Sequence, residues 1–396
     1  MVSAKSIVLV VNPGSASRKY ALFADGKKRA SIHFEFENNR IIGNIEYAYK
    51  QQSLAFDDLN FDDISRHILP LFREYNVINE DDNLTAIGIR VVAPSSRFLQ
   101  DELINEDVES ALEFVQKKAP LHVTMVLSEI KQLKNYFPDL PIIAVSDSAF
   151  HSTKPDWAWH YSIDTDLAYR LDLKRFGYHG ISVGSVVQRL KDDDALQNKT
   201  IICHLGSGCS VSAVVDGKSV DTTMGYTPLE GLTMATRSGN IDIAVALIIK
   251  QELDLDDDGL ERYLNNQSGL LGISGSSDDI RQLLESEEQG DERAKLALKI
   301  FGYRIQQAIG QMAASMGGVD CIVFSATIGE RSSIMRGRIM DNIGYLGFSY
   351  NSKLNDQAIE PTEITDISLR PSKPILVVET DEAAEIVRRV ELYLER

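Results

Sequence analysis

Five residues with catalytically able side chains stand in short polar segments of the sequence. Arg90 occurs in IGIRVVAPS, His122 in APLHV, Asp147 in AVSDSAFH, His179 in FGYHGIS and Arg237 in MATRSGN. Arginine and histidine supply positive charge that stabilises a phosphoryl group during its transfer. A carboxylate at the end of a strand orients a nucleophile or binds Mg²⁺. These residues together support phosphoryl transfer, provided that the fold brings them close to one another.

Two turns that contain glycine and serine add candidate anion-binding backbone to this set. One is NPGSAS at 12–17 and the other is GSG at 206–208, and each follows an apolar run. Backbone N–H groups that are exposed in such turns bind anions. Each turn leads into a second apolar stretch and then into an Asp-Gly-Lys hairpin turn, at 25–27 and at 216–218. We interpret this repeated order as a duplication within the chain.

Strands and helices of a mixed α/β protein are expected to position these residues. Strands are expected at 6–11, 19–23, 141–147, 321–326 and 374–379. Helices are expected at 107–117, 123–135, 183–192, 240–251, 278–286, 291–315 and from Thr380 onward. Thr380 is the expected cap of the last helix. The acidic stretch 253–261 is expected to be a solvated loop.

Composition and charge narrow the class of protein. The chain has 396 residues, of which 43% are hydrophobic, and a net charge of −17. Such a chain is repelled by DNA phosphates and by anionic lipid, so neither a nucleic acid nor a membrane is expected as a partner. Three cysteines are too few for a disulfide framework. The start lacks the features of a signal peptide, and we therefore expect a cytoplasmic protein.

Ordered motifs along the chain carry a resemblance to a known family. They are NPGSASRK (12–19), IRVVAPS (89–95), APLH (119–122), DSAFH (147–151), GYHGISV (177–183), HLGSGCS (204–210), DTTMGYTPLEGL (221–232), TRSGNID (236–242), SGLLGISG (268–275) and FSATIGERS (324–332). With these motifs, the sequence resembles the acetokinase family of short-chain carboxylate kinases over nearly its whole length.

The resemblance implies a duplicated ribonuclease-H-like α/β fold of the actin, sugar-kinase and heat-shock-chaperone type. In such a fold the active site lies in a cleft between two domains. The implied N-terminal domain covers 1–150 and is completed by a C-terminal helix at about 384–396. The implied nucleotide-binding domain covers 151–383. This organisation agrees with the repeated hairpin described above.

The resemblance also implies the reaction. Members of the family transfer the γ-phosphoryl group of ATP to acetate in a direct and reversible step, giving ADP and acetyl phosphate. The implied cofactor is Mg²⁺ or Mn²⁺, with ATP as co-substrate. The implied partners are acetate, acetyl phosphate, ATP and ADP, and a second copy of the chain in a homodimer.

Site residues carry over from the family motifs one by one. The implied catalytic residues are Arg90, His122, Asp147, His179 and Arg237. Arg90, Val92, Leu121, Tyr178 and Pro228 are implied to bind the acyl substrate. The implied nucleotide-binding residues are Asn12, Ser15, Ser17, Lys19, His204, Gly206, Ser207, Gly208, Asp279, Ile280, Arg281, Thr327, Ile328, Gly329 and Arg331. Asn12 and Glu382 are implied to lie near the metal.

The sequence departs from the family pattern mainly on the nucleotide side. Ser207 replaces an Asn, Asn240 an Asp, Thr327 a Gly and Arg331 an Asn. On the acyl side, Ile89 and Val183 replace histidines, and Ala93-Pro94-Ser95 replaces His-Gly-Gly. Three functions therefore stay open. They are an ATP-dependent acetate-phosphorylating enzyme, a relative with another donor (pyrophosphate or another nucleotide) or another acyl group (propionate or butyrate), and a non-catalytic regulatory homologue.

Overall fold

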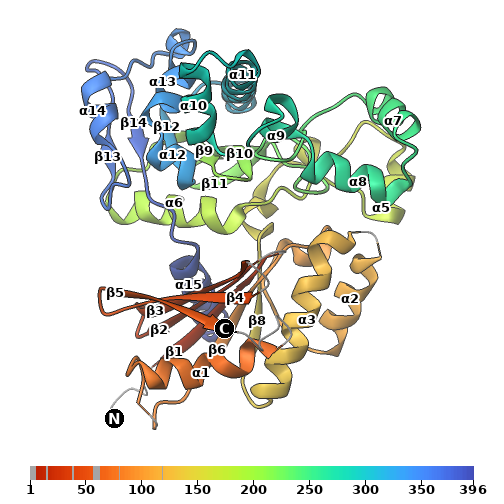
Figure 1. The fold of residues 1–396 in the computed structure, drawn as a ribbon, viewed down its shortest axis with the longest axis vertical. Coiled ribbons are helices and arrows are strands. Elements are labelled where there is room, and N and C mark those ends of the chain that lie inside the picture. The colour runs from red at the N-terminus through yellow and green to blue at the C-terminus, as the bar shows by residue number, and fades with distance from the viewer. Residues whose placement is uncertain (1–5, 15–16, 38–39, 57–62, 80, 118) are drawn as a thin grey trace. The chain divides into compact units, whose positions relative to one another are not determined.

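The computed structural model describes the chain except for residues 1–5, 15–16, 38–39, 57–62, 80 and 118 (Figure 1). The side chains of Glu37, Leu121 and His122 also lie outside the described part. The chain divides into two compact units. Unit 1 comprises Met1–Ala149 and Asp381–Arg396, and unit 2 comprises Phe150–Thr380. The chain therefore passes from one unit to the other twice.

Unit 1 is built on an eight-stranded sheet in the order β5-β4-β3-β2-β1-β6-β8-β7. The strands are β1 (Ile7–Pro13), β2 (Ser17–Ala24), β3 (Lys27–Glu37), β4 (Arg40–Tyr47), β5 (Lys50–Phe56), β6 (Ala86–Val91), β7 (Glu102–Leu103) and β8 (Ile142–Ser146). The helices are α1 (Ser65–Glu74), η2 (Ser96–Leu99), α2 (Glu106–Gln116), α3 (Pro120–Tyr136) and α15 (Glu382–Leu394). Both α3 and α15 pack against β1, which explains why that strand is apolar at successive positions.

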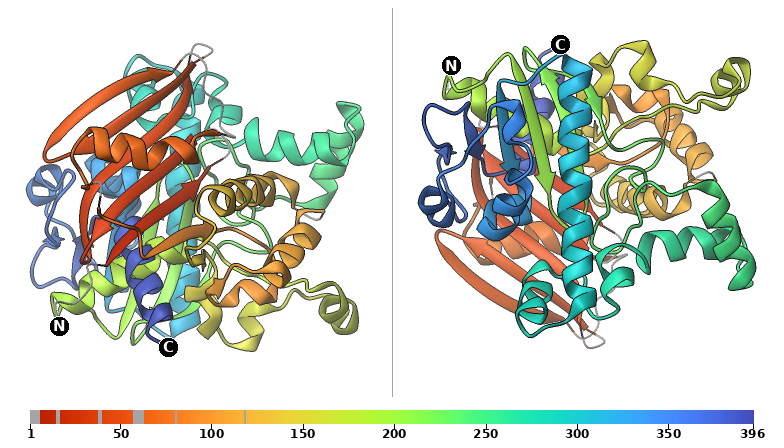
Figure 2. Two further views of the ribbon diagram at one scale, coloured as in Figure 1. Left: turned by 90° about the horizontal axis from the view of Figure 1, so that it is seen from below. Right: turned by 90° about the horizontal axis from the view of Figure 1, so that it is seen from above.

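Unit 2 is built on a six-stranded sheet in the order β11-β10-β9-β12-β14-β13. The strands are β9 (Lys199–Leu205), β10 (Cys209–Val215), β11 (Lys218–Thr222), β12 (Cys321–Ser325), β13 (Thr365–Asp366) and β14 (Ile375–Val377). The long helix α11 (Glu292–Met316) packs along β10 and β9 (Figure 2). Its apolar side chains thereby complete the core of this unit.

Shorter helices make up much of the rest of unit 2. They are η3 (Ala149–Thr153, which begins at the last residue of unit 1), α4 (Asp156–Trp159), α5 (Thr165–Leu171), α6 (Gly180–Asp192), α7 (Ile243–Glu252), α8 (Asp257–Asn266), α9 (Gly269–Ser274), α10 (Ile280–Glu288), α12 (Ala326–Arg331), α13 (Ser333–Met340), η4 (Gly344–Leu346) and α14 (Ser352–Gln357). Of these, α7 and α8 pack against each other. Capping aspartates begin several of the helices, such as Asp242 at α7 and Asp279 at α10. Side-chain acceptors at these positions satisfy N–H groups that have no partner within the helix.

The two sheets share one pattern of strands. The order β3-β2-β1-β6-β8 in unit 1 matches β11-β10-β9-β12-β14 in unit 2. Each is an antiparallel meander of three strands followed by two parallel strands. Asp25-Gly26 and Asp216-Gly217 form the corresponding hairpin turns, with positive φ at all four residues. The duplicated ribonuclease-H-like α/β fold is therefore confirmed, whereas the cleft between its halves stays a prediction.

Two local expectations are wrong. The last helix begins at Glu382, and its cap is Asp381, whose Oδ1 accepts from the N–H of Ala384 at 2.9 Å. Thr380 instead uses its hydroxyl to accept from the N–H of Ala326 at 3.2 Å. The acidic stretch 253–261 is partly helical because α8 begins within it. Acidic residues are favourable in the first turn of a helix, where they face the positive end of its dipole.

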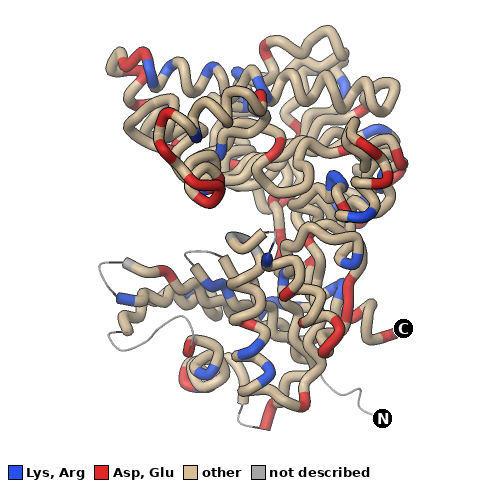
Figure 3. The backbone as a smooth tube through the Cα atoms, turned by 90° about the vertical axis from the view of Figure 1, so that its right-hand side faces the viewer, with Lys and Arg blue, Asp and Glu red and all other residues tan. Residues whose placement is uncertain are grey.

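The negative charge of the chain is distributed over both units. Acidic and basic positions are interspersed along the tube of each (Figure 3). In the part of the chain that the structure describes, no helix combines the length and the apolar composition needed to cross a membrane. Because acidic and basic positions are interspersed in both units, a local cluster of positive charge is possible despite the net negative charge of the chain.

Candidate functional site

Four polar residues meet at one edge of the sheet in unit 1. Arg90 donates from Nη2 to Asp147 Oδ2 at 2.9 Å, and its Nη1 lies 3.7 Å from Glu382 Oε2. Asn12 joins both partners, because its Nδ2 donates to Glu382 Oε2 at 3.1 Å and its Oδ1 accepts from Arg90 Nη1 at 3.4 Å. We call Asn12, Arg90, Asp147 and Glu382 the unit 1 cluster. It brings together Asn12 and Asp147, expected at strand ends, Arg90 near the end of β6, a strand that was not predicted, and Glu382 from the C-terminal helix.

The fold of unit 1 explains this convergence. The strands β1, β6 and β8 run parallel, so the residues at their carboxyl ends lie at the same edge of the sheet. Gly88 in β6 lets α15 approach that sheet closely. A Cβ atom at this position would lie 2.6 Å from Ile386 Cγ2 and 2.7 Å from Val390 Cγ2. Because Glu382 is the first residue of α15, this close packing places its carboxylate beside Arg90.

The unit 1 cluster contains a buried charge pair. The side chain of Asp147 is 1% exposed, and a carboxylate so buried needs a charged or hydrogen-bonded partner. Burial by itself lowers the pKa of Arg90, but the attraction of Asp147 and Glu382 outweighs it and raises the pKa above its ordinary value. Nε of Arg90 is buried without a hydrogen-bond partner among the described residues. Arg90 is thus a permanent cation whose side chain is 21% exposed and whose Nε is enclosed.

Unit 2 holds a second cluster around the turn 206–208. A Cβ atom on Gly208 would lie 3.1 Å from His179 Nε2 and 3.3 Å from Arg237 Nη1. His179 Nδ1 lies 3.1 Å from Ser210 Oγ, and the ring centroids of His179 and His204 are 4.5 Å apart. We call His179, His204, Gly208 and Arg237 the unit 2 cluster. A side chain at 208 would crowd both groups, and with glycine there the cluster surrounds bare backbone suited to an anion.

A cavity of about 460 Å³ lies in the same unit and holds eight of the predicted nucleotide-binding residues. These residues are Gly206, Ser207, Asp279, Ile280, Arg281, Thr327, Ile328 and Arg331. The cavity is within the usual range for small-molecule sites. Its apolar side chains, Ile280, Leu284, Ile328 and Ile334, suit the flat face of a nucleotide base. Ser207 lies in the turn 206–208, which also contains Gly208 of the unit 2 cluster.

Ion pairs hold the two arginines of this cavity. Arg281 donates from Nη2 to Asp279 Oδ2 at 2.6 Å, and hydrogen bonding from this arginine lowers the pKa of the Asp279 carboxyl. Arg331 pairs with Glu360, and both side chains are more than half exposed. Arg331, which replaces an Asn of the family, is therefore partly neutralised by Glu360. The electrostatic attraction between Arg331 and a bound nucleotide is weaker as a result.

The remaining predicted residues are distributed over both units. Ser17, Lys19 and Val92 lie in unit 1, and Lys19 is exposed in β2 opposite Asn12. Tyr178 and Pro228 are buried in unit 2, and Gly329 is buried within α12. Ser15 and the side chains of Leu121 and His122 lie outside the described residues. The structure therefore does not bring these residues into a single described pocket.

Several residues of the cavity were missed by sequence reasoning. Ala235, Asp278, Leu284, Ser332, Ser333 and Ile334 line it beside the predicted residues. Asp278 and Ser332 were detectable, because each directly follows or precedes a predicted residue in the SGSSDDIR and IGERS segments. Leu284 and Ile334 had no such signal. They face the cavity because their helices α10 and α13 pack against its walls, which a one-dimensional pattern does not encode.

The unit 1 cluster fits a hard divalent cation. Asn12, Asp147 and Glu382 offer amide and carboxylate oxygens, which are the ligands that Mg²⁺ prefers. Among the described residues, no group of three or more His, Cys, Asp or Glu could form a complete protein cage for a metal. Mg²⁺ usually binds through one or two carboxylates together with substrate phosphates. The donor set is therefore sufficient for a metal that is bound jointly with a substrate.

Comparisons with known proteins agree on one family. The sequence pattern described as the Acetokinase family matches residues 7–388. The chain is 37% identical over 390 residues to an acetate kinase of Clostridium botulinum strain Langeland, covering 96% of this chain and 98% of that one. It is 37% identical over 402 residues to an acetate kinase of Clostridium novyi strain NT, covering 98% of both.

Solved structures show the same similarity in three dimensions. A crystal structure of Porphyromonas gingivalis acetate kinase superposes with a TM-score of 0.88 and 30% identity, covering 98% of this chain and all of that one. A crystal structure of a Francisella tularensis propionate kinase superposes with a TM-score of 0.89 and 32% identity, covering 97% and 98% of the two chains. The similarity thus extends over both units of the chain.

Proposed function

The chain belongs to the acetokinase family, and from this membership we propose that it transfers the γ-phosphoryl group of ATP to acetate, reversibly, giving ADP and acetyl phosphate. It is a phosphotransferase with a carboxyl group as acceptor. The observation that carries the proposal is the survival of two charged clusters, one in each unit, although the nucleotide side has changed. A relative that had lost catalysis would have no need to keep Arg90 paired with a buried Asp147.

In the proposed mechanism, the unit 1 cluster handles the acceptor. Arg90 binds the carboxylate of acetate through its guanidinium, and its side chain is 21% exposed. Asp147 holds the guanidinium at 2.9 Å and thereby fixes its orientation. An acetate oxygen attacks the γ-phosphorus, while the bond from that phosphorus to the β–γ bridging oxygen breaks and its electron pair leaves with ADP.

The unit 2 cluster is proposed to stabilise the phosphoryl group in transit. His179 Nε2 and Arg237 Nη1 both lie beside the bare backbone of Gly208, where phosphate oxygens can approach closely. The hydrogen-bonded contact between His179 Nδ1 and Ser210 Oγ fixes the ring so that Nε2 faces the turn. Donors that are already in place, such as the guanidinium of Arg237, lower the free energy of a charged transition state at little reorganisation cost. His204 supports the ring of His179, and we propose the same role for His122.

Mg²⁺ or Mn²⁺ is proposed to bind through Asn12 and Glu382, with Asp147 orienting either the acetate or the metal. When bound, the ion neutralises charge on the phosphate oxygens. The cavity lined by Gly206, Ser207 and α12 is proposed to hold the nucleotide. Ser15, Ser17 and Lys19 are proposed to contact its phosphates, and Gly329 to allow close approach of the adenosine.

A colorimetric assay tests the function and the acyl pocket together. Acyl phosphate is trapped with hydroxylamine while ATP, GTP and pyrophosphate are each combined with acetate, propionate and butyrate. We expect acetate and propionate to be preferred, because Val92, Leu121, Tyr178 and Pro228 are proposed to form a small pocket. One methylene is worth only about 1–3 kcal/mol in discrimination, so propionate should react measurably. If kcat/KM were highest with butyrate, the proposed small acyl pocket would be wrong. If no combination of donor and acid gave an acyl phosphate, the proposed function would be wrong.

Replacing Thr327 by glycine should lower the KM for ATP about threefold or more and leave the KM for acetate unchanged. Thr327 is exposed on α12 and lines the cavity where the family has a glycine, so its side chain narrows the space for the nucleotide. Thr327→Ala is the matched control for helix propensity, since glycine destabilises a helix by about 1 kcal/mol. Wild-type protein that already binds ATP tightly and exclusively, with no change in either variant, would show that Thr327 is neutral.

The substitutions at the cavity favour one alternative, a broader choice of donor. Ser207 is shorter than the family's Asn, and loss of one phosphate hydrogen bond costs about 0.5–1.5 kcal/mol. We therefore expect weaker ATP binding than in typical relatives and weaker discrimination among ATP, GTP and pyrophosphate. Asn240 does not contribute to this effect, because its side chain accepts from the N–H of Gly231 at 2.9 Å and acts within its own loop.

We also propose that the chain forms a homodimer through α7. This helix carries an apolar row of three exposed residues, Ile243 (76%), Leu247 (57%) and Ile248 (58%). Single exposed apolar residues are common on protein surfaces, whereas a row of them marks an interaction site. The same row on a second copy could cover it symmetrically. Light scattering at micromolar concentration measures the mass, and Leu247→Glu with Ile248→Glu should convert dimer to monomer. A monomeric wild type would contradict the proposal.

A further inference from the structure

The loop at 223–240, between β11 and α7, has no regular secondary structure although much of it is buried. It carries Pro228, proposed to line the acyl pocket, and Arg237, proposed to stabilise the phosphoryl group. A buried loop without ladder or helix hydrogen bonds needs other partners for its backbone. Backbone groups hold part of it, since the N–H of Gly177 donates to the carbonyl oxygen of Gly225 at 3.2 Å and the N–H of Ala235 to that of Ser207 at 3.2 Å. Side chains from outside the loop supply further partners.

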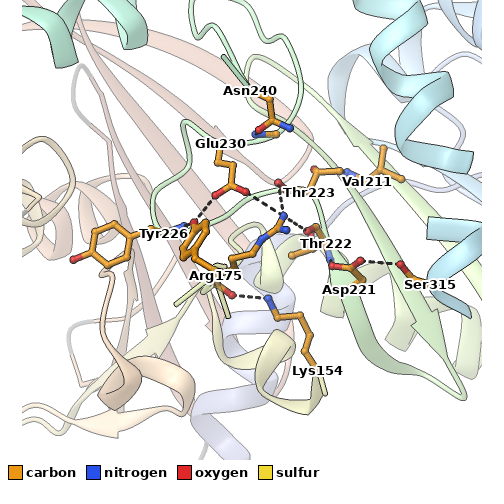
Figure 4. A network of polar contacts seen from close by, with 12 residues as sticks. Lys154, Arg175, Val211, Asp221, Thr222, Thr223, Tyr226, Glu230, Asn240 and Ser315 are labelled. Carbon is orange, nitrogen blue, oxygen red and sulfur yellow. Dashed lines mark hydrogen bonds and ion pairs between the residues drawn. The ribbon is translucent and has the colours of Figure 1, made fainter. Parts of the chain in front are cut away.

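A polar network supplies these partners (Figure 4). The hydroxyl of Tyr161 accepts from the N–H of Tyr226 at 2.8 Å and donates to Glu230 Oε2. Glu230 Oε1 lies 3.3 Å from Arg175 Nη2. The same nitrogen donates to the carbonyl oxygens of Thr222 and Thr223 at 3.3 and 3.4 Å, where the loop begins. The network thus joins the start of the loop to its middle.

The peptide groups at Tyr226 are held from both sides. Its N–H donates to Tyr161, and its carbonyl oxygen accepts from the hydroxyl of Tyr178 at 2.6 Å. Tyr178 is fully buried and directly precedes His179, while Pro228 lies two residues beyond Tyr226. A shift of Tyr226 would therefore move two residues of the proposed acyl pocket relative to each other.

The carboxylate of Glu230 packs directly onto backbone. A Cβ atom on Gly225 would lie 1.6 Å from Glu230 Oε2 and 2.5 Å from the hydroxyl oxygen of Tyr161. The far end of the loop has its own clamp, since Asn240 and Gly231 exchange hydrogen bonds of 2.9 Å through Asn240 Oδ1 and its backbone N–H. The segment from Tyr226 to Glu230 is therefore the part whose position depends on Tyr161 and Glu230.

We infer that Tyr161 and Glu230 are positioning residues that set the width of the acyl pocket and so the choice among carboxylates. The inference rests on the proposed function, because it concerns the same site. Neither side chain is proposed to touch a substrate. They act through Tyr226, by holding the backbone that leads to Pro228 and that accepts from the hydroxyl of Tyr178.

Tyr161→Phe is the direct test, because it removes the hydroxyl and keeps the ring. The N–H of Tyr226 then loses its partner, and we expect kcat/KM for acetate to fall about fivefold or more. Propionate should lose less, so the ratio of acetate to propionate kcat/KM should fall, and the KM for ATP should stay within twofold of wild type, roughly the error of such a comparison. Tyr169→Phe is the matched control, since Tyr169 is exposed on α5 and lies outside the network.

Glu230→Gln provides a second variant that keeps an oxygen for Tyr161 but removes the ion pair with Arg175. A smaller change of the acyl ratio in the same direction would support the inference. Lower thermal stability in both variants with an unchanged acyl ratio would overturn it, because the network would then be structural only. A wild type that forms no acyl phosphate would overturn the proposed function itself, and the two failures are therefore distinguishable.

Discussion

Replacing Arg90 by alanine should lower kcat about 10²–10³-fold, the usual cost of removing a fixed donor from a developing charge. Arg90 is the centre of the unit 1 cluster, where it contacts Asp147, Glu382 and Asn12. Its pKa is raised by the two carboxylates, so it stays charged throughout the pH range of the assay. Initial rates in both directions, measured at saturating substrates, give the effect on kcat.

Arg90→Lys separates the charge from the planar geometry of the guanidinium. Lysine keeps the charge but cannot donate to Asp147 and to a carboxylate in a fixed plane, so its activity should also be low. Arg97→Ala is the control in the same unit, because Arg97 pairs with Glu102, which is not a member of the cluster. Because Arg90→Ala leaves Asp147 buried without its cation, thermal unfolding must accompany the kinetics. A folded Arg90→Ala variant with more than half the wild-type kcat would exclude the assigned role.

Replacing Arg237 by alanine should also lower kcat about 10²–10³-fold, but through the phosphoryl group. Its Nη1 lies beside Gly208, together with His179 Nε2, and residue 208 has no side chain to occupy the space between them. The charge distribution of the phosphoryl group changes most in the transition state, where Arg237 is proposed to act. The variant should therefore lower kcat by a larger factor than it raises the KM for ATP. Steady-state kinetics with ATP and acetate varied in turn distinguish the two effects.

The control for Arg237 is Arg262→Ala, which removes an exposed arginine of the same unit that lies 3.9 Å from Asp256. It should leave kcat unchanged. Arg237 also contacts Met234 Sδ at 3.6 Å, so a structural contribution of its side chain to the 223–240 loop is measured by thermal unfolding. An Arg237→Ala variant that raises the KM for ATP and leaves kcat intact would assign this residue to nucleotide binding instead.

About half of the regular elements were predicted from sequence, and these are the ones whose patterns are local. The helix expected at 291–315 is α11, begun by the capping Asp291 and ended by Gly317 in a left-handed conformation. The start of the last helix was misplaced at Thr380 because threonine and aspartate are both good caps. Only the contact of Thr380 with Ala326 decides between them. The meander β3–β5 was not predicted, although Ala30, Ile32 and Phe34 in β3 alternate with polar residues and are buried.

The sequence by itself determined the duplication, the family and the residue types of the site. Each follows from order along the chain, and the hairpin with its Asp-Gly turn is a local structure that repeats. What only the tertiary structure decided is which of these residues meet. Arg90 reaches Glu382 because Gly88 lets the C-terminal helix pack closely on β6. Contacts between residues nearly 300 positions apart depend on packing, which no local pattern contains, and the pairing of Arg331 with Glu360 was hidden for the same reason.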